Sequence, residues 1–206
     1  MNPIPHKDSI LLFEGGNDVN PALYKQLVGH RTQKPDIERD IHEQSYFEMA
    51  KSVGAAMIGV CRGAQLLCVL NGGSLIQDAK GHQVWHQIAV PDKYDRIRFQ
   101  TSSAHHQVMN PYVLPKTDWQ SFGYAINHSP GKYKDGNNSK VKVYKCWPEW
   151  RDQEIVWFKK TKSLSIQGHP EWFKDQDAFF VKYCKFLVNF LLFRDEETRD
   201  GKIQTP

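Results

Sequence analysis

The chain has 206 residues, 40% of them hydrophobic and 24% charged, with a formal net charge of +4. This length suits one domain with a substantial core, and the mild, scattered positive charge argues against a nucleic-acid partner. No apolar run is long enough to span a bilayer and no signal peptide is recognisable, so we expect no membrane partner and a cytoplasmic location.

Residues 9–13 form the first apolar run and are predicted to be a buried strand. The glycine pair Gly15 and Gly16 follows directly. It would leave backbone N–H groups exposed at the carboxyl edge of a sheet, where open α/β folds bind their ligands. An ordinary glycine-rich turn is the alternative interpretation of this pair.

Residues 36–53 show the polar and apolar faces of a helix, which Gly54 would end. Two charged residues of this helix, Arg39 and Asp40, are either solvated surface groups or structural anchors near a site. The sequence leaves both alternatives open.

Residues 55–60 form a second apolar run that ends at Cys61, and a helix-like apolar pattern follows to residue 70. This pattern is typical of a buried strand that turns sharply into a helix, with Gly59 and Gly63 allowing close approach of the two backbones. A helix N-terminus lowers the pKa of a thiol and so favours a nucleophilic thiolate. The alternative is that Cys61 is a small buried core residue.

Beyond residue 80, the sequence predicts five strands and a final helix. The strands are expected at residues 81–90, 97–101, 119–127, 153–158 and 163–167. A lysine-rich turn at 159–162 would join the last two. The turn-rich segment 132–140 is predicted to be a mobile excursion, either a lid or a plain surface loop. Residues 176–193 carry apolar side chains at helical spacing, and the polar tail 194–206 is expected to fray.

Metal and disulfide chemistry are not indicated by the sequence. The adjacent His105 and His106, with Gln107 after them, lie on a predicted loop. A histidine pair without a carboxylate or cysteine at ligand spacing is a poor metal signal, so surface histidines remain an alternative. The four cysteines also lack CxxC spacing, which argues against both a disulfide framework and a zinc site; they are Cys61, Cys68, Cys146 and Cys184.

A candidate catalytic group combines Cys61 with His169 and Glu171, which follow the last predicted strand. A nucleophilic cysteine needs a base, and the base needs an acceptor that fixes its tautomer. In extended chain, residues two apart project the same way, and Pro170 would hold this segment extended. If parallel strands end at one sheet edge, the histidine can reach the cysteine. A helix-initiating His-Pro-Glu is the alternative.

Five motif blocks occur in order: residues 15–21 (GGNDVNP), 59–65 (GVCRGAQ), 72–75 (GGSL), 105–107 (HHQ) and 167–171 (QGHPE). Together they resemble the class I glutamine amidotransferase superfamily, and within it the γ-glutamyl hydrolase branch, peptidase family C26. The resemblance covers nearly the whole chain from residue 10 to about residue 193.

The resemblance implies an α/β fold, a flavodoxin-like three-layer sandwich with a mostly parallel central sheet and a small antiparallel extension. It also implies a single domain over 1–206, with a core at about 9–193. Relatives usually carry a strand and helix before the glycine-pair strand. We therefore expect that this sheet lacks one βα unit, that a partner fills its place, or that the chain is an abbreviated form.

The resemblance also implies a reaction. Cys61 would attack the side-chain carbonyl of a γ-glutamyl amide and form a γ-glutamyl thioester, with the histidine and glutamate completing a Cys-His-Glu triad. The oxyanion hole would comprise backbone N–H groups of Arg62 and of Gly15 or Gly16. The residues at these two turns, taken without the resemblance, also predict exposed backbone N–H groups there.

Substrate binding is assigned by the same analogy. Gln65 would contact the glutamyl moiety, and His105, His106 and Gln107 would shape the pocket. No metal and no cofactor are expected.

Two positions depart from the family pattern. Glu14 stands where proline is common, and its carboxylate would oppose a developing oxyanion if it pointed inward. Gly168 replaces a bulkier residue and is expected to widen the pocket.

Three functions follow from these features. The leading hypothesis is a free-standing hydrolase of γ-glutamyl amides or peptides. The second is a glutaminase subunit that supplies ammonia to a partner synthetase, and the third is a catalytically silent binding module on the same fold. The oligomeric state is left open.

Overall fold

The computed structural model describes residues 4–83, 85–91, 96–126, 133–134, 136, 151–175 and 178–193. In chain order, the helices and strands are β1 (Ile10–Phe13), η1 (Pro21–Tyr24), α1 (Ile37–Val53), β2 (Ala56–Val60), α2 (Arg62–Leu70), β3 (Ser74–Ile76), β4 (His86–Ala89), β5 (Arg98–Thr101), β6 (Val108–Asn110), η2 (Pro111–Val113), β7 (Trp119–Ala125), β8 (Gln153–Phe158), η4 (Lys159–Thr161), β9 (Ser163–Ile166), η5 (Pro170–Trp172) and α3 (Phe179–Leu192). Among these helices, none is long and apolar enough to cross a membrane.

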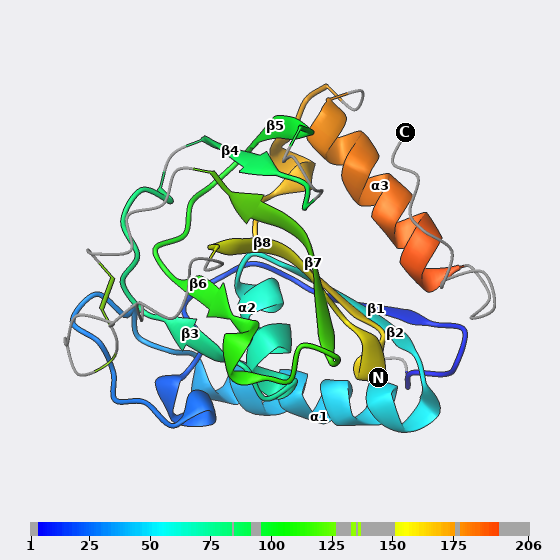
Figure 1. Cartoon of the computed structure of the whole chain (residues 1–206). Helices are drawn as coiled ribbons and strands as arrows, with labels where there is room; N and C mark the ends of the chain where they lie inside the picture. The colour runs from blue at the N-terminus through cyan, green and yellow to red at the C-terminus, as the bar shows by residue number, and fades with distance from the viewer. Residues whose placement is uncertain are drawn as a thin grey trace.

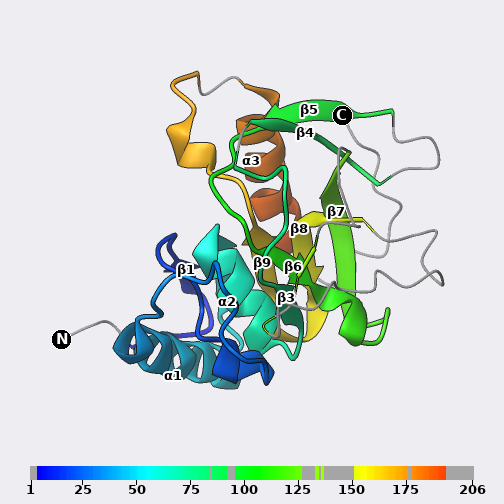
Figure 2. The ribbon, with the colours of Figure 1, turned by 90° about the vertical axis from the view of Figure 1, so that its left-hand side faces the viewer.

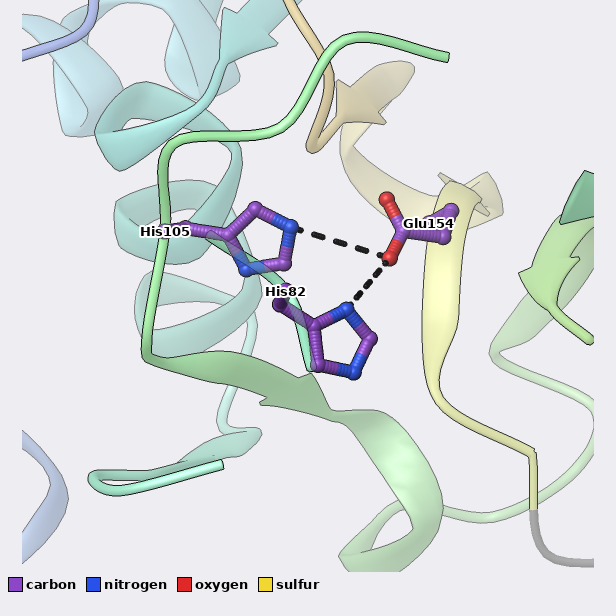
Figure 3. A group of neighbouring side chains, drawn as sticks. All are labelled: His82, His105 and Glu154. Carbon is purple, nitrogen blue, oxygen red and sulfur yellow. Dashed lines mark ion pairs between the residues drawn. The ribbon is translucent and has the colours of Figure 1, made fainter. Parts of the chain in front are cut away.

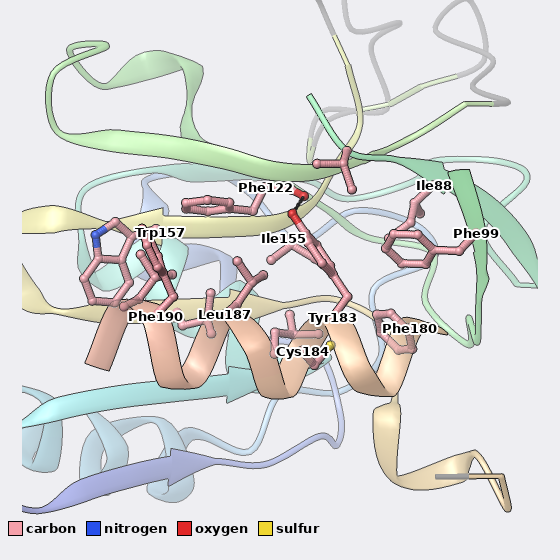
Figure 4. Close-up of a cluster of buried hydrophobic side chains, with 14 residues drawn as sticks. Ile88, Phe99, Phe122, Ile155, Trp157, Phe180, Tyr183, Cys184, Leu187 and Phe190 are labelled. Carbon is pink, nitrogen blue, oxygen red and sulfur yellow. Dashed lines mark hydrogen bonds between the residues drawn. The ribbon is translucent and has the colours of Figure 1, made fainter. Parts of the chain in front are cut away.

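The strands form one sheet between two helical layers (Figure 1). Its main path runs β1-β2-β9-β8-β7-β4-β5, and β6 pairs with both β3 and β8. Alternate residues of β8 point to opposite faces. Ile155 and Trp157 pack against α3 (Figure 4), whereas Val156 and Phe158 pack with residues of α2. Figure 2 shows α1 and α2 together, and the sheet therefore lies between them and α3.

The α/β class and the three layers are confirmed, but the sheet is mixed rather than mostly parallel. Parallel pairing is limited to β1 with β2 and β2 with β9. The other pairings are antiparallel. Parallel neighbours need long crossovers such as α1, whereas the short η4 connection between β8 and β9 can only make a hairpin. The antiparallel part is therefore the larger one.

The helix signals in the sequence are confirmed at residue level. Asp36 caps α1 by accepting the Arg39 N–H at 3.0 Å, and Gly54 ends it with φ of 70°. Both are the residue types that helix ends favour. The short strand β6 was not predicted, because three residues carry too little periodicity to be recognised.

The predicted excursion at 132–140 is described at residues 133, 134 and 136 only. Tyr133 is fully buried, and the backbone of Lys134 pairs with Asp78 at 3.0 and 3.1 Å. These residues lie against the body of the protein, so a lid is not supported for them. Cys146 and the predicted tail 194–206 lie outside the described residues.

We expect Gly63→Ala to destabilise the protein, although alanine is the better helix former by about 1 kcal/mol. A Cβ at this position would overlap the backbone carbonyl of Phe13, because α2 lies directly against β1. Overpacking of this kind costs about 1–3 kcal/mol. Urea denaturation measures the change, with the exposed Ser45→Ala on α1 as the control expected to shift little. A stabilised Gly63→Ala protein would contradict the close approach.

Candidate active site

The pairing of β2 with β9 brings the predicted nucleophile and base to one sheet edge. The two strands are parallel, with Val60 opposite Ile166, and the Cys61 N–H donates to the Ile166 carbonyl at 2.9 Å. Cys61 directly follows β2, and His169 lies three residues beyond the end of β9. The predicted convergence of the two strand ends is therefore confirmed.

Cys61 occupies a strained turn between β2 and α2. Its φ of 52° and ψ of −110° lie where few non-glycine residues are found. Such strain is characteristic of residues that a fold holds in place for function. A Cβ on Gly59 would overlap the backbone of Gly63, so the predicted close approach of strand and helix is present.

The imidazole of His169 is held from several sides. Its Nδ1 lies 2.6 Å from Glu171 Oε1, and Trp172 stacks on it with ring centroids 3.8 Å apart. Ser102 Oγ accepts the His169 backbone N–H at 2.8 Å and donates to the His169 carbonyl at 3.0 Å. Sequence reasoning missed Ser102 and Trp172; the adjacency of the tryptophan to the His-Pro-Glu motif is the one signal that could have indicated it.

Gly15 lies between the cysteine and the histidine. A Cβ placed on Gly15 would lie 3.2 Å from His169 Cε1 and 3.6 Å from Cys61 Cβ. The turn after β1 therefore touches both side chains, and a larger residue at this position would crowd the histidine.

Arg39 orients the glycine turn. Its guanidinium donates to the carbonyls of Gly15 and Glu14, each at 3.0 Å. Because N–H and C=O point in opposite directions across a trans peptide, the N–H groups of Gly15 and Gly16 face away from Arg39. Gly16 has φ of 152°, and a Cβ on it would overlap the guanidinium. The side chain of Glu14 is exposed.

The buried side chain of Arg62 belongs to the same ion-pair network as Arg39. Its guanidinium forms ion pairs with Asp40 and Glu43 of α1, and Arg39 Nε donates to Glu43 at 2.9 Å. The question left open by the sequence is thereby answered, because Arg39 and Asp40 are structural anchors of this edge.

Three buried glutamines meet in the interior, one of them (Gln65) one helical turn after Cys61. Gln65 Nε2 donates to the Gln107 carbonyl at 3.1 Å and to Gln167 Oε1 at 3.4 Å. The side-chain amide of Gln107 is buried with no hydrogen-bond partner among the described residues. Gln65 and Gln107 are thus brought together.

The two adjacent histidines separate into different environments. His105 and His106 are only 4% and 6% exposed, which excludes surface histidines. His106 contacts Asp18 at 3.2 Å, and its hydrogen bond to Asp18 raises the pKa of His106. His105 instead points toward His82 and Glu154, which sequence reasoning did not connect with it.

The predicted lowering of the cysteine pKa is not found. Burial raises the pKa of the Cys61 thiol to about 11, and the nearby charges of Glu171, Glu154 and Asp18 add to this effect. The backbone N–H of Arg62 bonds to the sulfur and acts in the opposite direction, but it is outweighed. The resting thiol is therefore protonated at neutral pH.

An apolar groove of about 630 Å³ opens beside this edge. Leu12, Ile58, Val181 and Val188 line it, and Glu171 lies at its boundary. The expected widening at Gly168 is not found, because a Cβ at that position would overlap Thr101.

The fold and this sheet edge define a protein of the class I glutamine amidotransferase type. The glutaminase domain of Trypanosoma brucei CTPS with bound acivicin superposes with a TM-score of 0.52 at 12% identity, covering 90% of this chain and 72% of that one. The sequence profile of Peptidase C26 matches residues 7–117, and the chain belongs to this family.

Several curated relatives match most of the chain. Glutamine amidotransferase-like protein YvdE of Lactococcus lactis subsp. lactis is 41% identical over 197 residues, covering 87% of this chain and 72% of YvdE. Gamma-glutamyl-gamma-aminobutyrate hydrolase of Escherichia coli O157:H7 is 22% identical over 200 residues, covering 90% and 75%. The chain spans 31% and 66% of the lengths of two further curated relatives.

The raised pKa of Cys61 predicts how its alkylation depends on pH. Iodoacetamide attacks thiolates, so the rate should rise about tenfold per pH unit between about pH 7 and pH 10. Mass spectrometry of the native protein measures this rate, with the fully buried Cys68 as the unreactive reference. A rate that is flat over this range would indicate a thiolate already formed at neutral pH and would contradict the assignment.

Proposed function

We propose that this chain hydrolyses the amide bond of a γ-glutamyl compound, either glutamine or a γ-glutamyl amide or peptide, with Cys61 as the nucleophile. The observation that carries the proposal is the strained position of Cys61 beside His169 and the Gly15 turn. Catalytic cysteines need a base and amide donors at one point, and this edge offers both.

The first step transfers the thiol proton to His169. A hydrogen bond from Nδ1–H to Glu171 leaves Nε2 as the acceptor, and it also stabilises the imidazolium that forms. The sulfur then attacks the side-chain carbonyl of the substrate, and the carbonyl electron pair moves to oxygen. Backbone N–H groups of Arg62 and of Gly15 or Gly16 stabilise the resulting oxyanion.

Collapse of this intermediate breaks the carbon–nitrogen bond. The leaving amine takes the proton from His169, and a γ-glutamyl thioester remains on Cys61. A water molecule then gives its proton to His169 and attacks the thioester. Glutamate is released and the proton returns to the sulfur, so the cycle needs no cofactor.

The glutamyl moiety would be bound by Gln65, Gln107 and His106. The unpaired amide of Gln107 supports this assignment, because a buried polar group without a partner is costly unless a ligand satisfies it. His105 would shape the pocket indirectly, since its ring hydrogen-bonds to the Gln107 carbonyl at 2.8 Å.

A glutaminase subunit that supplies ammonia to a synthetase is the second candidate. The apolar groove beside Glu171, with Leu12 exposed at its wall, is the specific observation in its favour, because partner subunits cover surfaces of this kind. In either case the chemistry at Cys61 is the same.

A substrate panel tests the proposed function. Glutamine, γ-glutamyl-aminobutyrate, γ-glutamyl peptides and polyglutamate are incubated with the purified chain, glutamate release is followed, and the thioester is trapped for mass spectrometry. Cys61→Ala should abolish turnover, whereas the matched control Cys68→Ala should retain it. Activity that survives in Cys61→Ala would end the proposal.

The same panel distinguishes the alternatives. Release that rises when a synthetase is added favours the ammonia-supplying subunit. Failure of a thiol-reactive γ-glutamyl analogue to label Cys61 favours a silent binding module.

Arg39→Gln should lower kcat about 10²-fold with little change in KM, because loss of one oxyanion donor costs about 10²–10³-fold. Arg39 acts through the glycine turn and is a positioning residue. Steady-state kinetics on the best substrate measures the effect, and Lys51→Gln on the exposed side of α1 is the control. A rise in KM at unchanged kcat would assign Arg39 to substrate binding instead.

A further inference from the structure

Three buried side chains behind the candidate active site converge on one point that the proposed hydrolysis leaves unexplained. His82, His105 and Glu154 come from separate segments, and Figure 3 shows both imidazoles aimed at the same carboxylate oxygen. His82 Nδ1, His105 Nε2 and a Glu154 oxygen all lie within 4.8 Å of one another. None of the three side chains is more than 2% exposed.

The two nitrogen–oxygen distances are close to those between ligands that share an ion. His82 Nδ1 lies 3.3 Å and His105 Nε2 3.7 Å from Glu154 Oε1. Both exceed the about 2.7–3.2 Å of an N–H···O hydrogen bond, and neither nitrogen has a hydrogen-bond partner among the described residues. Ligands about 2.0–2.1 Å from a tetrahedral zinc ion lie about 3.3 Å from each other.

The hydrogen bond of His105 to a backbone carbonyl determines which ring nitrogen faces the carboxylate. A carbonyl oxygen can only accept, so the bond to Gln107 fixes the proton on Nδ1. In that tautomer Nε2 carries the lone pair, and it faces Glu154 Oε1 at 3.7 Å. A lone pair facing a carboxylate is repulsive unless a cation lies between them.

The outer hydrogen bonds also match those of metal-binding histidines. Such histidines usually donate their second ring N–H to a carboxylate or a backbone carbonyl. His82 Nε2 lies 2.8 Å from Asp152, which also accepts from Tyr133, and His105 donates to Gln107. His86 Nε2, 3.0 Å from Glu154 Oε1, further fixes the carboxylate.

We propose that His82 Nδ1, His105 Nε2 and the Glu154 carboxylate bind a zinc ion. Two imidazoles and one carboxylate are a ligand set that zinc favours. Because the ligands are buried and come from three segments, the ion stabilises the protein rather than reacting with substrate. It fixes the segment that carries Gln107 and thereby the proposed glutamyl pocket.

The metal-free account is a protonated His82 between two carboxylates. In this account the two ring nitrogens of His82 face Asp152 at 2.8 Å and Glu154 at 3.3 Å. This arrangement explains the contact between His82 and Glu154. It leaves the lone pair of His105 facing a carboxylate without a proton or an ion.

Metal content of the full chain separates the two accounts. The protein is expressed in medium supplemented with zinc sulfate, dialysed, and measured by inductively coupled plasma mass spectrometry. We expect about one zinc ion per chain. His105→Gln and Glu154→Gln should each lower this content at least tenfold, whereas the matched control His106→Gln, one residue away, should retain it.

The proposal is overturned if the wild-type chain carries less than about a tenth of an equivalent, or if both ligand variants keep the full content. Should the variants fail to fold, X-ray absorption at the zinc edge decides on wild-type protein alone. Nitrogen and oxygen neighbours at about 2.0–2.1 Å with imidazole scattering support the site. A sulfur neighbour at about 2.3 Å would assign the metal to a cysteine and refute it.

Discussion

The parallel register of β2 with β9 is the constraint on which the candidate site depends. These strands are about a hundred residues apart in sequence, and the pairing of Val60 with Ile166 determines which side chains emerge beyond the strand ends. A slip of one residue would reverse the faces of every side chain on β9. The hydrogen bond from the Cys61 N–H to the Ile166 carbonyl extends the ladder into the turn itself. The proposed nucleophile and the proposed base are therefore positioned by one continuous backbone pairing.

Buried ion pairs hold the turn after β1 in place beside Cys61 and His169. Arg62 is fully buried, and the Glu43 carboxylate forms ion pairs with both Arg62 and Arg39. Because Arg39 also donates to the Gly15 carbonyl, this one carboxylate links α1, α2 and the turn after β1. Removing Arg62 would leave the buried Asp40 carboxylate unpaired, and breaking a buried ion pair in this way typically costs about 3–5 kcal/mol. The network therefore fixes the direction of the glycine N–H groups. It also makes the charged residues of the network hard to substitute.

Local sequence patterns correctly predicted the features that are determined by neighbouring residues in the chain. The helix over 36–53, the bend at Cys61 and the pair of His169 with Glu171 follow from caps, periodicity and spacing of two residues. The sheet was predicted less well, because the balance of parallel and antiparallel pairing depends on which distant strands meet. The pKa of Cys61 was also missed, since the helix terminus can be read from sequence but the depth of burial cannot. The meeting of His105 with Glu154 has no local signal, because the partners are 49 residues apart in the chain.

The segment from Ser102 to Gln107 connects the buried histidine cluster to the candidate active site. At one end, Ser102 Oγ makes two hydrogen bonds with the backbone of His169. At the other end, the Gln107 carbonyl accepts from both Gln65 and His105. Between them, Ser103 donates to the backbone carbonyl of His82. A displacement of His105 would therefore move the acceptor of Gln65 and strain the support of His169 together. The proposed catalytic geometry at the sheet edge therefore depends on how the charges are paired in a cluster that does not touch Cys61 or His169.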